Sequence, residues 1–420
     1  MAVVFYISLI VGAAGLLLLI RLARLNSIPG LAMGGRTLLL LSVLLPGADY
    51  VLERSHRDKA TSAPAVPVYS FMAAKGDPDA FKAWWAYYAA EWVLPNGGAA
   101  SIQMPDPEGI LPFIHKPNSV AAFFDATIRI NNFGFRGPDI EFDKGDRYRI
   151  FALGESPTFG ATIRRDDRAW PEVLGALIQS RLQCARPIEV INAGTGGYHL
   201  QHNIERLRRN IIPLKPDLVL SYHGSNGARF VELGADTSAP ESVPQRTEGP
   251  SRLIKEAIYR YRLYRWRKTP AAAASFSEER ILQSPYAELY RQLIRLGRAN
   301  NFQVVLSTFS MAVTQSSPRE VTEFYSMTSS GGDGIVARMA AHNRIVEKIA
   351  AEQHVPLIDT TPNLDGKWDD DLFLDPTHLT QKGSDSLANT MLAGLMPIFR
   401  GDGTLRCTQR SRNSAHPAHR

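Results

Sequence analysis

Short apolar runs alternate with helical patterns over the carboxyl-terminal two-thirds of this chain. The spacing predicts strands over residues 148–153, 188–191, 218–222, 302–308 and 355–359, and helices over residues 170–182, 199–210, 336–352 and 381–395. Short strands separated by helices of this length favour a parallel sheet that is covered on both faces. We therefore predict a three-layer α/β/α fold of flavodoxin-like type, whose site lies where the strands end.

A serine and a histidine stand at opposite ends of this alternating region. Ser156 follows the first strand in Phe151-Ala-Leu-Gly-Glu-Ser156, and the far partner closes Asp375-Pro-Thr-His378. Asp375 can orient the imidazole of His378 and stabilise its protonated form, while the other ring nitrogen takes the proton of the serine. The pairing indicates acyl chemistry with Ser156 as the nucleophile.

Two loops between these residues could complete such a site. Asn192-Ala-Gly-Thr-Gly-Gly197-Tyr and His223-Gly-Ser-Asn226-Gly each follow a predicted strand, so both should open on the edge of the sheet that carries Ser156. Gly197 lets a backbone N–H point at a developing oxyanion, and the amide of Asn226 can supply a further donor. We predict that the two loops form an oxyanion hole.

The four segments together resemble the SGNH or GDSL hydrolases, a family named after the Ser, Gly, Asn and His of four sequence blocks. The similarity covers roughly residues 147 to 399. It implies a Ser-His-Asp esterase that needs no cofactor or metal. The implied roles are nucleophile and oxyanion donor for Ser156, oxyanion donors for Gly197 and Asn226, and triad partners for Asp375 and His378. The upstream phrase Asn131-Asn-Phe-Gly-Phe-Arg-Gly137 also resembles a lead-in seen in bacterial envelope members.

Two positions depart from the family pattern. The first block usually reads Gly-Asp-Ser, whereas this chain has Glu155, and the third usually ends Asn-Asp, whereas Gly227 follows Asn226. Neither change removes a catalytic atom, but both alter the loops that hold the site. The sequence therefore predicts an active serine enzyme, and a degenerate copy that only binds its ligand is the alternative.

Composition limits the other classes of function. The net charge of +6 is modest for 420 residues and does not indicate a nucleic-acid partner. Cys184 and Cys407 exclude a cysteine-rich zinc site and are expected to be free thiols, although they could pair outside the cytoplasm. His199, His202 and His223 could in principle hold a metal, but no nearby carboxylate motif supports this, and we expect none.

The amino terminus is typical of a membrane segment. Residues 3–20 form an uncharged run of 18 residues, and residues 31–52 form a second apolar stretch interrupted by Arg36 and Asp49. Basic residues lie in or beside the linker between the two runs, which predicts a helical hairpin with the catalytic region outside the cytoplasm. A single span would leave that region in the cytoplasm, and a cleaved signal peptide is a further alternative.

The predicted organisation has five parts. These are a transmembrane region (1–53), a linker (54–67), a small α+β preface (68–145), a hydrolase domain (146–399) with an insertion at 228–283, and a disordered tail (400–420). The insertion carries a basic aromatic stretch, 252–268, that fits an ordinary solvated helix, a lid or lipid-contacting helix, or, least well, a nucleic-acid contact.

The sequence thus predicts a membrane-anchored esterase that deacylates a cell-envelope glycan or lipid. The alternatives are an O-acyltransferase acting on an envelope polysaccharide and a glycan-binding protein with an inactive triad. Its expected partners are the acyl-ester substrate and the membrane.

Overall fold

The computed structural model describes residues 99–123, 126–163, 165–231, 277–326 and 335–410, together with the single residues 258, 261 and 264. The predicted transmembrane region (1–53), the linker (54–67) and most of the insertion (228–283) lie outside these residues. Of the basic aromatic stretch, Ile258, Tyr261 and Tyr264 are helical and exposed. Among the described residues, no helix is both long enough and apolar enough to cross a membrane.

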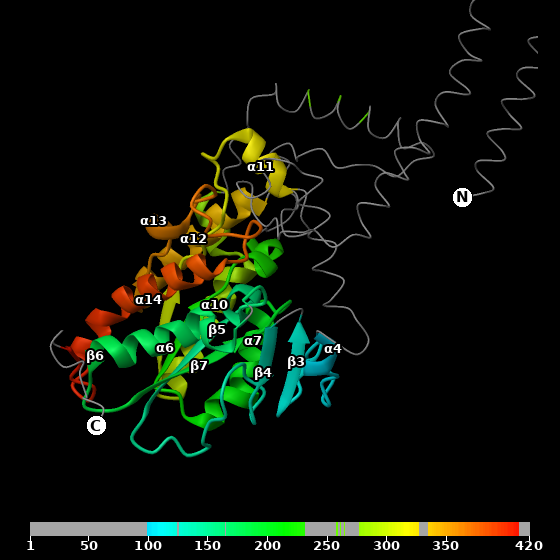
Figure 1. Ribbon diagram of the computed structural model, residues 1–420. Helices are drawn as coiled ribbons and strands as arrows, with labels where there is room; N and C mark the ends of the chain where they lie inside the picture. The colour runs from blue at the N-terminus through cyan, green and yellow to red at the C-terminus, as the bar shows by residue number, and fades with distance from the viewer. Residues whose placement is uncertain are drawn as a thin grey trace, which may run out of the picture. The chain divides into compact units, whose positions relative to one another are not determined.

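A five-stranded parallel sheet forms the centre of the catalytic unit, in the order β10-β9-β8-β5-β7. Figure 1 shows β5 and β7 side by side within it. The strands are β5 (Tyr148–Gly154), β7 (Ile188–Gly194), β8 (Leu218–Tyr222), β9 (Gln303–Ser307) and β10 (Leu357–Ile358). Every pair of neighbours in this sheet is parallel. The carboxyl ends of these strands therefore meet at one edge, as the alternation in the sequence predicts.

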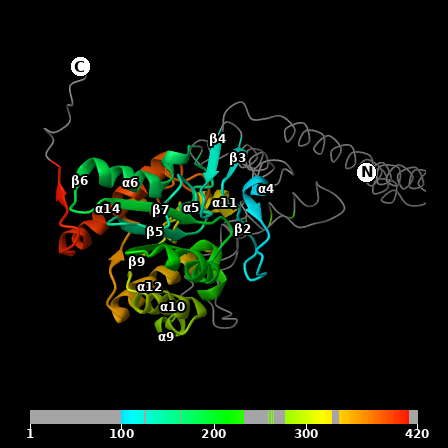
Figure 2. The ribbon, with the colours of Figure 1, turned by 90° about the horizontal axis from the view of Figure 1, so that it is seen from below.

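Helices cover both faces of the sheet (Figure 2). One layer contains α6 (Trp170–Arg181) and α14 (Gln381–Gly401), and the other contains α7 (Leu200–Arg206), α10 (Pro285–Ala299) and α12 (Ile335–Gln353). The interior strand β5 contributes to both layers, because Ile150 and Ala152 pack into the first core and Phe151 and Leu153 into the second. This period of two on a fully buried strand confirms the three-layer α/β/α architecture.

The described part of the preface forms two small antiparallel pairs beside the sheet. It comprises α4 (Ala99–Ile102), β1 (Gln103–Met104), β2 (Ile114–His115), β3 (Ser119–Phe123) and β4 (Ala126–Ile130), with β1 paired to β2 and β3 to β4. Its buried residues Ile102, Ile128 and Ile130 share a core with Phe159 of α5 (Ser156–Phe159). The preface thus packs against the helix that begins with the predicted nucleophile.

The remaining described elements are short. They are η1 (Asp166–Arg168), β6 (Leu182–Gln183), η2 (Leu207–Ile211), η3 (Ile212–Leu214), η4 (Ser225–Val231), α9 (Glu278–Leu282), α11 (Arg319–Ser326), α13 (Thr361–Leu364) and β11 (Thr408–Gln409).

The expectation of two free thiols is wrong. Cys184 and Cys407 form a disulfide that joins residues 223 positions apart, and β11 pairs antiparallel with β6 beside it. The prediction of disorder is also wrong for residues 400–410, because Leu405 and Cys407 are buried against the main core. These two buried side chains hold in place a segment that is otherwise polar, and its polar composition led to the prediction of disorder. Residues 411–420 lie outside the described part.

Candidate active site

Ser156 lies at a sharp turn between β5 and the short helix α5. The turn needs close backbone contacts: a Cβ added to Gly154 would lie 2.5 Å from the carbonyl oxygen of Tyr222, and one added to Gly194 would lie 2.1 Å from the nitrogen of Phe159. Only glycine permits both approaches. The glycines at the ends of β5 and β7 therefore let α5 sit directly on the sheet edge, with Ser156 as its first residue.

Ser156, His378 and Asp375 form a continuous hydrogen-bonded chain. The Nε2 atom of His378 lies 2.8 Å from Ser156 Oγ, and its Nδ1 atom lies 2.6 Å from Asp375 Oδ2. The other carboxylate oxygen of Asp375 accepts hydrogen bonds from the backbone N–H groups of Thr377 and His378, at 2.8 Å each. These bonds hold the carboxylate in one orientation, so the imidazole is aligned with the serine hydroxyl.

The electrostatics of the pair suit a general base. Burial alone would raise the pKa of Asp375, but the charge of His378 and the hydrogen bonds that Asp375 accepts lower it below its usual value. Burial alone would lower the pKa of His378, but the charge and hydrogen bond of Asp375, with a smaller contribution from Glu155, raise it. The carboxylate is therefore ionised when the imidazole receives a proton, and it stabilises the imidazolium that forms.

The two predicted oxyanion segments lie against each other at the same edge. A Cβ added to Gly196 would be 3.9 Å from the Cβ of Ser156, and Gly197 has a φ of +79° with open space where a side chain would be. The Nδ2 atom of Asn226 donates a hydrogen bond to the carbonyl of Tyr198, at 2.8 Å. This bond uses one of the two amide hydrogens, so Asn226 keeps a second for a ligand.

Comparison with known proteins identifies the family. A model of the GDSL-like Lipase/Acylhydrolase family matches residues 152–385, more than half of the chain. The chain belongs to this family. Its match begins within β5 and ends within α14, so the predicted site residues of all four blocks lie inside it. No curated protein matches the chain.

Solved structures of low sequence identity are similar to this GDSL-like chain. A lipase/acylhydrolase from Enterococcus faecalis is 16% identical, with 63% of this chain and 98% of that one covered at a TM-score of 0.38. The acetylxylan esterase Axe2 from Geobacillus stearothermophilus is 16% identical, with 61% and 96% covered at a TM-score of 0.36. A GDSL-like lipase from Bacteroides thetaiotaomicron is 14% identical, with 60% and 89% covered at a TM-score of 0.35.

Glu155, the first departure from the usual family pattern, connects two blocks of the site. Its fully buried carboxylate accepts hydrogen bonds from the backbone nitrogens of Gly224 (3.1 Å) and Asn226 (3.0 Å) and from the hydroxyl of Ser225 (3.2 Å). Burial raises the pKa of Glu155 to about 7, although these hydrogen bonds oppose the shift. Glu155 thus ties the nucleophile turn to the Asn226 loop, a role that the sequence comparison alone did not assign.

Gly227, the second departure, is explained by a neighbouring tyrosine. A Cβ added to Gly227 would lie 2.6 Å from Cζ of Tyr286, so the aspartate usual in the family would clash here. The hydroxyl of Tyr286 donates a hydrogen bond to the carbonyl of Gly224, at 3.1 Å. The loop that carries Asn226 is therefore held from one side by Glu155 and from the other by Tyr286.

The three histidines weighed as metal ligands have other surroundings. The ring nitrogens of His223 lie 2.9 Å from Asn203 Nδ2 and 2.9 Å from Ser221 Oγ, and burial lowers the pKa of His223 to about 3. The rings of His199 and His202 stack with centroids 3.7 Å apart. Within the described ranges, no three His, Cys, Asp or Glu side chains gather in a way that could hold a metal ion.

Proposed function

We propose that this GDSL-family hydrolase is a serine esterase that removes acyl groups from a cell-envelope glycan or lipid. The observation that carries the proposal is the chain of 2.8 Å and 2.6 Å contacts from Ser156 through His378 to Asp375. A serine hydroxyl within hydrogen-bond reach of an oriented imidazole is the arrangement that activates an oxygen nucleophile.

The reaction follows from this geometry in two halves. Ser156 Oγ attacks the ester carbonyl while His378 Nε2 takes its proton, and the tetrahedral oxyanion is held by the N–H groups of Ser156 and Gly197 and by the Asn226 amide. The intermediate collapses as the alcohol leaves with the proton from His378, and an acyl-serine remains. Water then attacks the acyl-serine, with His378 again as base and then acid, and releases the carboxylic acid and free Ser156.

The proposed location is outside the cytoplasm, with the hairpin 1–53 as the anchor. The disulfide between Cys184 and Cys407 supports it, because such bonds persist in oxidising compartments and are rare in the cytosol. The uncharged run 3–20 supports the anchor. To test the location, fresh cells expressing the full chain are quenched with acid and treated with a thiol-reactive maleimide. Unmodified Cys184 and Cys407 fit the proposal, and modification of both cysteines contradicts it.

The function is tested by turnover. The full-length chain and its Ser156→Ala variant are compared on p-nitrophenyl acetate and octanoate, and on O-acetylated and deacetylated polysaccharide. We expect ester hydrolysis that the variant loses, with the preferred chain length separating a deacetylase from a lipase. Hydrolysis that is equal in both proteins would refute the esterase. Acyl transfer to the polysaccharide without release of free acid would instead establish the O-acyltransferase, and binding without turnover the inactive glycan-binding protein.

A further inference from the structure

We propose that the lead-in segment 131–137 is a positioning element of the active site, which fixes both the nucleophile helix and the oxyanion loop. Two arginines make the connections: Arg136, within the segment, and Arg206, which reaches it from α7. The inference rests on the proposed serine esterase. The segment precedes the family match at 152–385, whereas Arg206 lies within it.

Arg136 fixes the end of the helix that begins with Ser156. Its buried guanidinium donates from Nη1 to the carbonyls of Phe159 (2.8 Å) and Gly160 (2.7 Å). The Nη2 atom donates to the carbonyls of residues 163 and 165, at 3.1 and 3.2 Å. The carbonyls of Phe159 and Gly160 lie at the helix end and have no partner within the helix, so this planar fork gives them a charged donor and sets their direction. The carbonyls of residues 163 and 165 belong to the loop that follows.

The fixed end of the helix leads back to the nucleophile within one turn. The backbone nitrogen of Gly160 donates to the carbonyl of Ser156, at 2.9 Å, and that of Ala161 donates to the same carbonyl, at 3.2 Å. Gly160 has a φ of +76°, and a Cβ added there would lie 2.9 Å from Arg136 Nη1. A shift of the guanidinium therefore moves the peptide units that are hydrogen-bonded to Ser156.

Arg206 connects the same segment to the oxyanion loop. Its Nη1 atom donates to the carbonyl of Ala193 (2.8 Å) and to the hydroxyl of Thr195 (2.6 Å), which flank Gly194. Its Nη2 atom donates to the carbonyl of Gly134, at 2.8 Å. Burial lowers the pKa of Arg206 to about 10, so the guanidinium stays charged at neutral pH. One cation thus joins the turn of the segment to the loop that precedes Gly197.

The segment is itself a rigid turn. The side-chain oxygen of Asn131 accepts from the backbone nitrogens of Phe133 (2.9 Å) and Phe135 (3.0 Å), and Gly134 has a φ of +80°. The backbone of Arg136 forms an antiparallel bridge with Asn192 at the end of β7. The turn therefore presents a carbonyl to Arg206 and a guanidinium to α5 from a fixed position, and this is what a positioning element requires.

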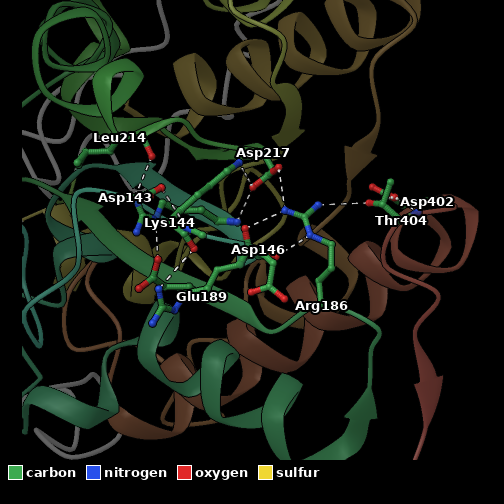
Figure 3. A network of polar contacts seen from close by, with 12 residues as sticks. Asp143, Lys144, Asp146, Arg186, Glu189, Leu214, Asp217, Asp402 and Thr404 are labelled. Atoms are coloured by element: carbon green, nitrogen blue, oxygen red, sulfur yellow. Dashed lines mark hydrogen bonds and ion pairs between the residues drawn. The ribbon is translucent and has the colours of Figure 1, made fainter.

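The test compares two buried arginines with similar local roles. Arg149 is fully buried at the amino end of β5, donates to the carbonyls of Glu141 (2.8 Å) and Leu214 (2.9 Å), and pairs with Glu189 at 2.6 Å. Glu189 and Leu214 belong to a polar network near Arg149 (Figure 3). Ser156 follows the other end of β5. Arg149→Met is therefore the matched control for Arg136→Met, since each removes a guanidinium that holds backbone carbonyls.

The full-length variants are assayed for kcat, KM and the rate at which a fluorophosphonate modifies Ser156, each per mole of folded protein. We expect Arg136→Met to lower kcat and the modification rate by about 10²-fold, as a misplacement of about 1 Å would, with KM little changed. Arg149→Met should lower the melting temperature and leave both rates near the wild-type values. Arg136→Lys keeps the positive charge but loses the planar fork of donors, so its kcat and modification rate should fall as well. This variant replaces Arg136→Met in the test if the methionine variant does not fold.

Two results would overturn the inference. In one, the fluorophosphonate modifies Ser156 of the folded Arg136 variants at the wild-type rate, and these variants hydrolyse ester at the wild-type rate. In the other, Arg149→Met loses as much kcat as Arg136→Met, which would make the effect one of general stability. Wild-type protein that reacts with the fluorophosphonate and hydrolyses no ester would refute the proposed esterase alone, because the ratio of modification rates still decides the role of the segment.

Discussion

Replacing Glu155 with Gln tests how the nucleophile turn is held to the Asn226 loop. The substitution keeps the size of the side chain and removes its charge. The carboxylate offers one oxygen to Gly224 and the other to both Ser225 and Asn226. The neutral acid present at pH 5 keeps a hydroxyl oxygen that can still accept a hydrogen bond. The amide nitrogen of Gln only donates, and it must face at least one of these donors. A buried donor left unpaired in this way costs about 1–3 kcal/mol of the free energy of unfolding.

The charge adds a pH-dependent part to this difference. Burial raises the pKa of Glu155 from 4.5 to about 7 in the folded protein. A folded-state pKa above the unfolded one gives stability that is complete below pH 4.5 and is lost as the pH rises through 7. At 1.36 kcal/mol for each pKa unit, the wild type loses roughly 2–3 kcal/mol between pH 5 and pH 8 through this group. Gln does not titrate, so the variant avoids this loss.

Urea unfolding of the full-length wild type and variant at pH 5 and pH 8 measures both parts. We expect the variant to be less stable at pH 5 and the deficit to shrink or reverse by pH 8. A deficit that stays constant within about 1 kcal/mol, or that grows with pH, would refute this account of Glu155. The kcat of the variant should fall at both pH values, because the Asn226 loop loses one of its fixed contacts.

Three further predictions follow from the site and the fold. The kcat/KM for an ester should fall on the acid side with a midpoint above pH 6.5, because only the neutral ring of His378 is a base. Burial lowers the pKa of His378, but Asp375 raises it by more. A flat profile from about pH 5 to 9 would contradict this. Cys184→Ser should lower the free energy of unfolding by about 2–5 kcal/mol, since the disulfide to Cys407 closes a long loop, and reductant should do the same to the wild type but not to the variant. Gly194→Ala should abolish turnover in protein that is still folded, because its methyl group would lie 2.1 Å from the backbone of the nucleophile helix; wild-type kcat in this variant would show that the helix is not held as described.

The parallel sheet could be predicted because its interior strands β5 and β8 are short runs that are buried on both faces. The predicted strand 148–153 is β5 within one residue, and 218–222 is β8. The end of β7 was missed: it continues to Gly194 because its polar and glycine residues still pair with β5. The predicted helix 199–210 divides into α7 and a wider turn, η2. Hydrophobic patterns do not carry these backbone details.

Those residues of the candidate site could be predicted whose place in the sequence indicates their role. Asp375 and His378 are three residues apart, and Ser156 follows a strand, so local chemistry indicates their roles. The partners of Glu155 come from a loop about 70 residues away, and those of Arg136 from helix-end carbonyls. Contacts between side chains and distant backbone leave no period in the sequence. The disulfide could not be predicted either, because its two cysteines lie 223 residues apart in the sequence.

The central claim is that Ser156 is a nucleophile activated by His378, and covalent modification tests it most directly. The full-length protein, Ser156→Ala and His378→Ala are incubated with a fluorophosphonate, and the adduct is located by mass spectrometry of peptides. We predict one adduct on Ser156 in the wild type, none in Ser156→Ala, and strongly slowed modification in His378→Ala. An unmodified Ser156 in folded wild-type protein, or modification that is equally fast without His378, would contradict the account.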